Sequence, residues 1–238
     1  MGAGAALSSL VSVFPQVVWL SEHKEALFAV AGAALALTFA TAAFAQREPV
    51  LKQICRNIAA RSGVVVVTAQ YRLAPEHRFP VAVEDAWDAT AWLATRGAEL
   101  GLDATRLALG GDSAGGNLAA VVALQARDDA PPAAQLLIYP AIDSETERPS
   151  QALFGEGYFL SRGDRDAFSR HYLAGTGVDG RDPRVSPIYA PDLSGLAPAL
   201  VVTAGFDLLR DEGEAYAEAL RAAGTKARLM RISGHGHG

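Results

Sequence analysis

The sequence has almost no cysteine, because Cys55 is the only one among 238 residues, and this excludes a disulfide within the chain. It also lacks a Cys/His cluster and His-x-x-x-His spacing, so it carries none of the common patterns of a metal site. Runs of Lys and Arg are missing as well, and the net charge is −5. Without a basic stripe to follow a phosphate backbone, we expect no nucleic-acid partner, and we expect no metal.

Residues 26–46 (ALFAVAGAALALTFATAAFAQ) contain no charged residue. Such a run is long enough to span a bilayer, and its end at Ala45 resembles a signal-peptidase site. It is nevertheless rich in Ala rather than Leu, and Glu22, Lys24 and Glu25 precede it in place of a basic segment. We therefore expect a cytoplasmic protein with no membrane partner. The alternative is an exported protein whose signal-like segment ends near Ala45.

The remaining composition is that of one globular domain, since half of the residues are hydrophobic and 20% are charged. Residues 1–46 are Ala-rich and low in charge, whereas residues 47–238 have an ordinary mixed composition. We predict one globular domain over residues 47–238. The preceding residues 1–46 are an atypical segment, which we interpret as a cap remnant, a signal-like segment or an aberrant sequence from a shifted reading frame.

Short apolar runs alternate with stretches of helical periodicity after residue 47. The run at residues 64–68 is rich in β-branched side chains, as is typical of a strand buried on both faces. This alternation predicts an α/β fold with a mostly parallel central sheet covered by helices on both faces. The predicted strands are 64–68, 107–110, 134–139, 199–203 and 226–232, and the predicted helices are 48–61, 81–96, 114–127, 164–173 and 211–223.

A G-x-S-x-G motif centred on Ser113 lies between a predicted strand and a predicted helix. Such a turn holds its central residue in a strained conformation, so the flanking positions must lack side chains. The backbone N–H of Ala114, at the start of the following helix, is placed to stabilise a developing oxyanion. The motif predicts a nucleophilic serine on a turn whose supporting residues are Gly111, Asp112, Gly115 and Gly116.

Two motifs resemble those of the hormone-sensitive-lipase-like family of α/β hydrolases. GDSAGG at residues 111–116 is similar to the family's nucleophile motif, and YRLAPEHRFP at residues 71–80 is similar to a second family motif upstream of it. The resemblance extends from about residue 48 to residue 238. It implies that residues 47–238 form an α/β-hydrolase domain, and that the protein is a serine carboxylesterase or lipase-like hydrolase that needs no cofactor. The implied substrates are small-molecule esters with short acyl chains or aryl groups.

A nucleophilic serine requires a base and an orienting carboxylate, which follow it in the order acid, then histidine. The segment GFDLLRDEG resembles the family's acid motif and assigns Asp207 to the triad, whereas Asp211 and Glu212 lie at a helix start and are interpreted as structural. The chain ends in SGHGHG, so His235 and His237 are both candidate bases. The family register and the spacing from Asp207 favour His237, and His235 is the alternative.

The chain departs from the family pattern near both ends. The family's HGGG loop, which supplies further oxyanion N–H groups, is missing, and residues 39–44 occupy its nearest register with side chains that suit a close backbone approach poorly. Residues 1–46 give no sign of the family's early strands, and the family's last helix is missing too. The alternative function is therefore a catalytically weak or inactive ligand-binding relative on the same fold.

Overall fold

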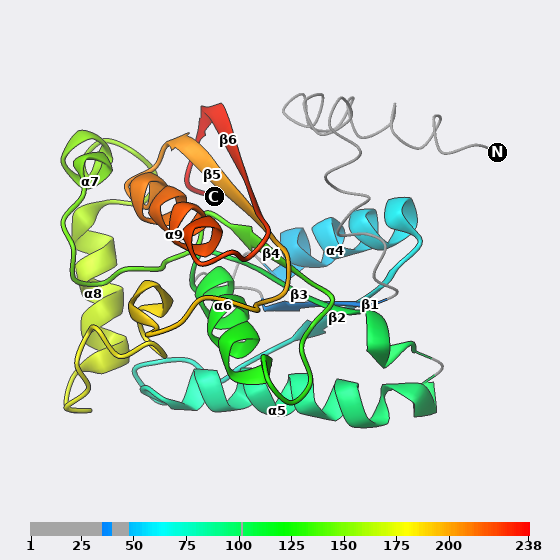
Figure 1. Ribbon diagram of the computed structural model, residues 1–238. Helices are drawn as coiled ribbons and strands as arrows, with labels where there is room; N and C mark the ends of the chain where they lie inside the picture. The colour runs from blue at the N-terminus through cyan, green and yellow to red at the C-terminus, as the bar shows by residue number, and fades with distance from the viewer. Residues whose placement is uncertain (1–34, 40–47, 101) are drawn as a thin grey trace.

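The computed structural model describes residues 35–39, 48–100 and 102–238. Within this part of the chain, six strands form one sheet in which every neighbouring pair is parallel, in the order β2-β1-β3-β4-β5-β6 (Figure 1). The predicted parallel α/β sheet is confirmed. The strands are β1 (Leu35–Phe39), β2 (Val65–Ala69), β3 (Leu107–Asp112), β4 (Ala134–Ile138), β5 (Ala199–Phe206) and β6 (Ala227–Gly236).

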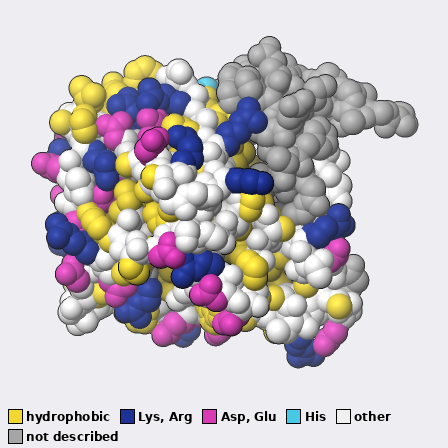
Figure 2. All heavy atoms as spheres, viewed as in Figure 1, with side chains coloured by type: hydrophobic (Ala, Val, Ile, Leu, Met, Phe, Trp, Pro, Cys, Tyr) yellow, Lys and Arg dark blue, Asp and Glu magenta, His cyan; other side chains and the backbone are white. Residues whose placement is uncertain are grey.

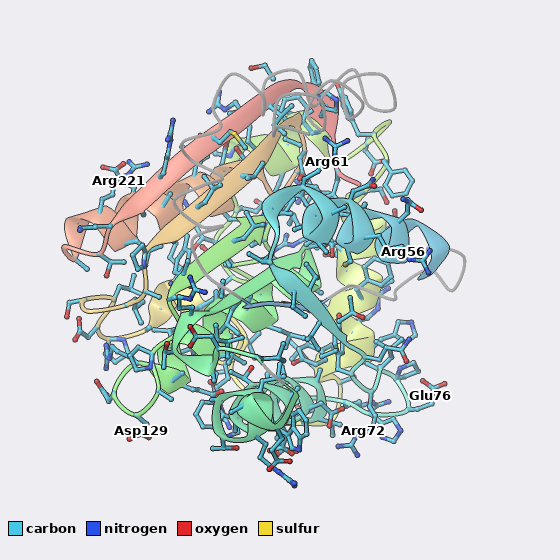
Figure 3. All side chains as sticks on the ribbon, turned by 90° about the vertical axis from the view of Figure 1, so that its right-hand side faces the viewer. Arg56, Arg61, Arg72, Glu76, Asp129 and Arg221 are labelled. Carbon is cyan, nitrogen blue, oxygen red and sulfur yellow. The ribbon has the colours of Figure 1, made fainter. Side chains whose placement is uncertain are left out.

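Helices cover both faces of the sheet. Helices α5, α6 and α9 pack on one side, while α4 lies on the other side of the strands (Figure 1). In the turned view, α4, which carries Arg56 and Arg61, crosses in front of the strands (Figure 3). The helices are α4 (Glu48–Ser62), α5 (Val81–Arg96), α6 (Ala114–Ala126), α7 (Pro149–Phe154), α8 (Arg162–Leu173) and α9 (Arg210–Ala222), with short 3-10 turns at Gly97–Leu100, Ala104–Arg106 and Pro187–Tyr189.

Helix α6 lies at the centre of the main core because it is apolar on nearly every side. Leu118, Val121 and Val122 are at most 3% exposed and belong to the same cluster as Leu109 of β3 and Tyr216 of α9. Each fully buried aliphatic side chain contributes about 1.5–3 kcal/mol relative to an exposed one. The turn that carries Ser113 precedes this helix directly, so a largely buried helix positions it.

The sheet corrects one expectation about residues 1–46, because Leu35–Phe39 forms strand β1 between β2 and β3. We expected no family strand in this segment. A central parallel strand is apolar along its whole length, so inside a longer Ala-rich run its periodicity does not separate it from a helix. The rest of residues 1–46, including the signal-like end at Ala45, lies outside the described residues.

Strands β5 and β6 both run further than the sequence predicted, and they do so together. Phe206 pairs with Gly236 after an irregularity in register, so the Gly-rich end of the chain up to residue 236 is part of the sheet. A Cβ at position 205 would overlap the backbone of Ser233, which explains the glycine where the strands approach closely. The extension brings Asp207 and His237, the residues that follow the two strands, to the same edge.

The surface carries both signs of charge, in keeping with the modest net charge of −5. Figure 2 shows basic and acidic side chains interspersed over the face drawn, with no continuous basic stripe there. Over the part of the chain that the structure describes, none of the helices combines the length and the apolar character needed to cross a bilayer.

Candidate active site

The predicted site residues lie beyond the carboxyl ends of the parallel strands. Ser113 follows β3, Asp207 follows β5, and His237 follows β6. Parallel strands present their carboxyl ends along one edge, where ligands of open α/β sheets bind. The fold therefore assembles at one place residues that are up to 124 positions apart in the sequence.

The turn at Ser113 has the strained geometry that the motif predicted. Its φ of 54° and ψ of −118° are unusual for a residue with a side chain. A Cβ at Gly111 would overlap the backbone carbonyl of Gly115, and one at Gly116 would come within 2.9 Å of the Pro140 side chain. Glycine is therefore required where the turn folds back on itself and where it meets the segment after β4, and Asp112 ends the strand that leads into it.

Three predicted residues form a chain of hydrogen bonds. Nε2 of His237 lies 2.9 Å from Oγ of Ser113, and Nδ1 lies 2.8 Å from Oδ2 of Asp207. Asp207 is buried, and its other oxygen accepts a hydrogen bond from the backbone N–H of Leu209 at 2.9 Å. Because both carboxylate oxygens have partners, the carboxylate is fixed in orientation, and the imidazole is held at both of its ring nitrogens.

The alternative base, His235, is placed differently. It lies within β6 and is half-buried, and among the described residues no hydrogen bond joins it to Ser113 or Asp207. Its Nδ1 is buried without a partner in that part of the chain. Geometry therefore favours His237 for contact with the serine.

Ala114 is the first residue of α6, and the first N–H groups of a helix have no partner within it. The residue lines the same cavity as Ser113. Phe39, the last residue of β1, pairs with Gly111 beside the nucleophile turn. The position that the family's HGGG loop would occupy therefore begins beside the turn at Ser113. Residues 40–44, which correspond to that loop here, lie outside the described residues.

A cavity of about 550 Å³ opens onto Ser113 and His237. One wall comes from the loop after β2 and the other from α8, and the lining is mainly apolar. The two walls are in direct contact. The Phe79 N–H donates to the Tyr172 carbonyl at 3.0 Å, and the rings of these two residues pack edge to face. The apolar wall residues include Tyr71, Leu73, Phe159, Phe168, Tyr172 and Leu173.

The YRLAPEHRFP motif builds the first of these walls. Arg72, labelled in Figure 3, contacts Asp85 of α5 through its backbone N–H and its guanidinium, at 2.7 Å for the shortest contact. The hydrogen bond from this guanidinium lowers the pKa of Asp85. Arg78 donates to the carbonyl of Ala174, just beyond α8, at 2.6 Å. The motif therefore anchors the loop to α5 at one end and to the α8 wall at the other.

Sequence reasoning missed two polar residues that brace the site, and their only sequence signal is their place in or after a motif. Asn117, in the first turn of α6, donates from Nδ2 to the carbonyls of Ala141 and Val185 at 2.7 and 2.8 Å. Tyr139, directly after β4, lies with its ring centroid 4.5 Å from that of His237.

The two carboxylates interpreted as structural do contact backbone N–H groups, although those of other segments. Asp211 accepts from the Ser150 N–H at 2.8 Å. Glu212 is completely buried, and its Oε1 accepts from the N–H groups of Ile142 and Asp143 at 2.8 and 3.2 Å. Burial raises the pKa of Glu212 to about 7.

Comparison with known proteins identifies relatives of this chain. A family model described as alpha/beta hydrolase fold matches residues 31–238. Carboxylic ester hydrolase LipN of Mycobacterium tuberculosis is 48% identical over 192 residues, which cover 78% of this chain and 51% of the relative. Ethyl acetate hydrolase of Pseudomonas putida is 43% identical over 187 residues, which cover 77% of this chain and 58% of the relative. The chain thus spans little more than half the length of these relatives.

Solved structures give the same result. A hyperthermophilic esterase from the archaeon Pyrobaculum calidifontis matches with a TM-score of 0.80 and 41% identity, over 87% of this chain and 69% of that one. EstE1, a thermostable carboxylesterase cloned from a metagenomic library, matches with a TM-score of 0.80 and 42% identity, over 87% of this chain and 71% of that one. Identities above 40% over most of the chain extend the likeness beyond the fold.

Proposed function

Because the chain belongs to the hormone-sensitive-lipase-like family of α/β-hydrolase-fold proteins, we propose that it hydrolyses small-molecule carboxylic esters through an acyl-enzyme formed on Ser113. The observation that carries the proposal is the chain of contacts from Ser113 through His237 to the buried Asp207. This is the arrangement that a serine hydroxyl needs to become a nucleophile near neutral pH.

The geometry supports a two-step acyl transfer. With its Nδ1 proton directed at Asp207, His237 accepts the Ser113 proton at Nε2 as Oγ attacks the ester carbonyl carbon. The carbonyl oxygen becomes an oxyanion, which accepts a hydrogen bond from the Ala114 N–H. Collapse breaks the ester C–O bond, and the imidazolium gives its proton to the departing alcohol. A water molecule, deprotonated by the same histidine, then releases the carboxylic acid and restores Ser113.

The cavity supports acyl or aryl esters of modest size as substrates. Its apolar walls offer a hydrocarbon or ring a favourable environment, and a volume of about 550 Å³ lies within the range of small-molecule sites. Relatives named as carboxylesterase, arylesterase and ethyl acetate hydrolase agree with this class. A ligand-binding relative without turnover is the less favoured alternative, because binding alone requires no base in contact with the serine.

A fluorophosphonate probe tests the proposal, since it phosphonylates an activated serine and ignores an ordinary hydroxyl. We expect labelling of Ser113, identified by mass spectrometry of the tryptic peptide. Ser113→Ala abolishes it, and His237→Ala slows it by about 10³-fold or more. His235→Ala is the matched control and retains labelling. An intact chain that binds an ester but leaves Ser113 unlabelled would support the ligand-binding alternative.

A further inference from the structure

The segment after β4, residues 139–143, runs along the nucleophile turn, and we refer to it as the β4 turn. The N–H of Ser113 donates to the carbonyl of Ile138 at 2.9 Å, immediately before this segment. The carbonyl of Ser113 accepts from the N–H of Ala141 within it, at 3.2 Å. Both backbone groups of Ser113 therefore bond to the end of β4 or to the β4 turn that follows it.

Buried side chains fix the β4 turn from two directions. Asn117 of α6 donates to the carbonyl of Ala141 at 2.7 Å, and Glu212 of α9 accepts from the N–H groups of Ile142 and Asp143. Asn117 and Glu212 are 8% and 1% exposed. The turn is thus tied to the helix that follows the nucleophile and to the helix that follows Asp207.

Tyr139 is the first residue of the β4 turn and has an unusual backbone. Its φ is 33°, in the region that a bulky side chain rarely adopts, and its N–H donates to the carbonyl of Val202 at 2.6 Å. Residues persist in such a conformation only where the surrounding structure imposes it, and such residues cluster at functional sites. The Tyr139 ring lies beside the His237 ring. Their centroids are 4.5 Å apart, and the interplanar angle is 53°.

From this contact we infer that Tyr139 is a positioning residue for His237, which rests on the proposed function of His237 as the base for Ser113. Hydrogen bonds at the two ring nitrogens leave the imidazole able to rock about the line that joins them, and the Tyr139 ring restrains this motion. An aromatic ring also interacts favourably with the imidazolium that forms during each acyl transfer. The β4 turn thereby sets the nucleophile backbone and the base ring from one rigid segment.

Four variants of the full chain test the inference. Tyr139→Leu removes the ring, Tyr139→Phe keeps it, and Tyr139→Gly removes it while adopting the positive φ without strain. Trp92→Leu is the control, because it removes a half-exposed aromatic residue of α5 outside the site. The readouts are kcat and KM for p-nitrophenyl butyrate, the thermal midpoint, and the low-field proton NMR signal of the His237 Nδ1–H in the absence of substrate.

We expect Tyr139→Leu and Tyr139→Gly to lower kcat at least about tenfold, with KM changed less than about threefold, since base placement affects the transition state more than binding. Tyr139→Phe and Trp92→Leu stay within about threefold of wild type. The low-field signal broadens or disappears in the two ringless variants only. A purely structural role would shift the thermal midpoint without this division between kcat and KM.

The inference is overturned if either ringless variant folds and keeps kcat within twofold of wild type, or if Tyr139→Phe loses as much activity as Tyr139→Leu. The glycine variant keeps the test valid if the leucine variant does not fold. Failure of the proposed function looks different, because the wild type would then hydrolyse no faster than Ser113→Ala. In that case the NMR signal, which needs no turnover, decides whether Tyr139 holds the imidazole.

Discussion

The backbone of Ser113 has a strained conformation because the chain folds back closely on itself at this turn. Gly111 lies against the carbonyl of Gly115, which belongs to the backbone and cannot move aside as a flexible side chain would. Residues that tolerate such closeness must be glycines. The placement of Ser113 at the sheet edge therefore depends on the glycines around it.

Gly111→Ala tests this dependence. The added Cβ overlaps the Gly115 carbonyl, so we expect a loss of about 3 kcal/mol or more in the free energy of unfolding and loss of probe labelling at Ser113. Urea unfolding followed by circular dichroism measures the first effect. Gly163→Ala in α8 is the control, because its Cβ would meet only Ser161 Oγ at 3.7 Å. Equal stability of the two variants would show that the turn tolerates a side chain at position 111.

Glu212 predicts a pH-dependent stability. Burial raises its pKa to about 7, above the value of about 4.3 in an unfolded chain. The folded state therefore favours the protonated form, and this stabilisation is fully present below about pH 4 and is lost as pH rises through about 7. Glu212→Gln stays neutral, so the wild type should lose up to about 3 kcal/mol relative to this variant between about pH 5 and pH 8.

Chemical denaturation of both proteins at several pH values measures the Glu212 effect, since contributions from other groups cancel in the difference. Carboxylates such as Asp85, whose pKa is lowered by Arg72, lose their stabilising effect only as pH falls through the acidic range. A constant difference across the whole range would contradict a raised pKa for Glu212.

Local motifs mark the three residues of the proposed triad, whereas no local motif marks the bracing residues Asn117 and Tyr139. The serine turn and the acid segment can be read from short patterns, but the choice between His235 and His237 depended on the family register and on the spacing from Asp207. The contact of Tyr139 with the base depends on where β4 ends relative to β6, two strands away in the sheet. Such a relation between segments distant in sequence leaves no local pattern.

At the scale of elements, α6 connects the nucleophile to the segments around it through Asn117. Its amide donates to two carbonyls, that of Ala141 in a part-buried hydrogen bond and that of Val185 in a buried one. Asn117→Ala leaves both acceptors without this donor, so we expect a loss of about 3 kcal/mol in unfolding free energy. Asn57→Ala in α4, which removes a surface hydrogen bond with Gln53, should change it by less than about 0.5 kcal/mol.

Thermal or urea unfolding of the two asparagine variants gives the comparison. A loss at Asn117 no larger than that at Asn57 would contradict the bracing role of the first turn of α6. The expected loss should be accompanied by slower probe labelling, because the same amide holds the β4 turn against the nucleophile.

Helices were easier to predict than strand limits. The helix predicted at residues 81–96 has the bounds of α5, whereas α8 begins two residues before its predicted start, at a capping box of Ser161 and Asp164 that was not recognised. β1 was hidden in an Ala-rich run, and the ends of β5 and β6 depend on each other. Helical periodicity is local, but how far a strand runs depends on pairing with a neighbour that is distant in the sequence.

At the scale of the whole molecule, the parallel sheet turns a long sequence separation into contact. Ser113, Asp207 and His237 each follow a different strand and meet because all the strands point the same way. The resemblance to a hydrolase family predicted this architecture, and the strand order explains why it produces a site at the carboxyl edge. The cavity between α8 and the loop after β2 opens at this edge, and its mainly apolar lining suits the proposed ester substrates.

The central claim is that Ser113 and His237 carry out ester hydrolysis, and the initial rate of p-nitrophenyl butyrate hydrolysis tests it most directly. Purified wild-type chain is compared with Ser113→Ala, His237→Ala and His235→Ala. We predict a clear wild-type rate that Ser113→Ala and His237→Ala each reduce by about 10³-fold or more, while His235→Ala retains most of it. A wild-type rate no greater than that of Ser113→Ala would contradict the account, and loss of activity in His235→Ala alone would assign the base to His235.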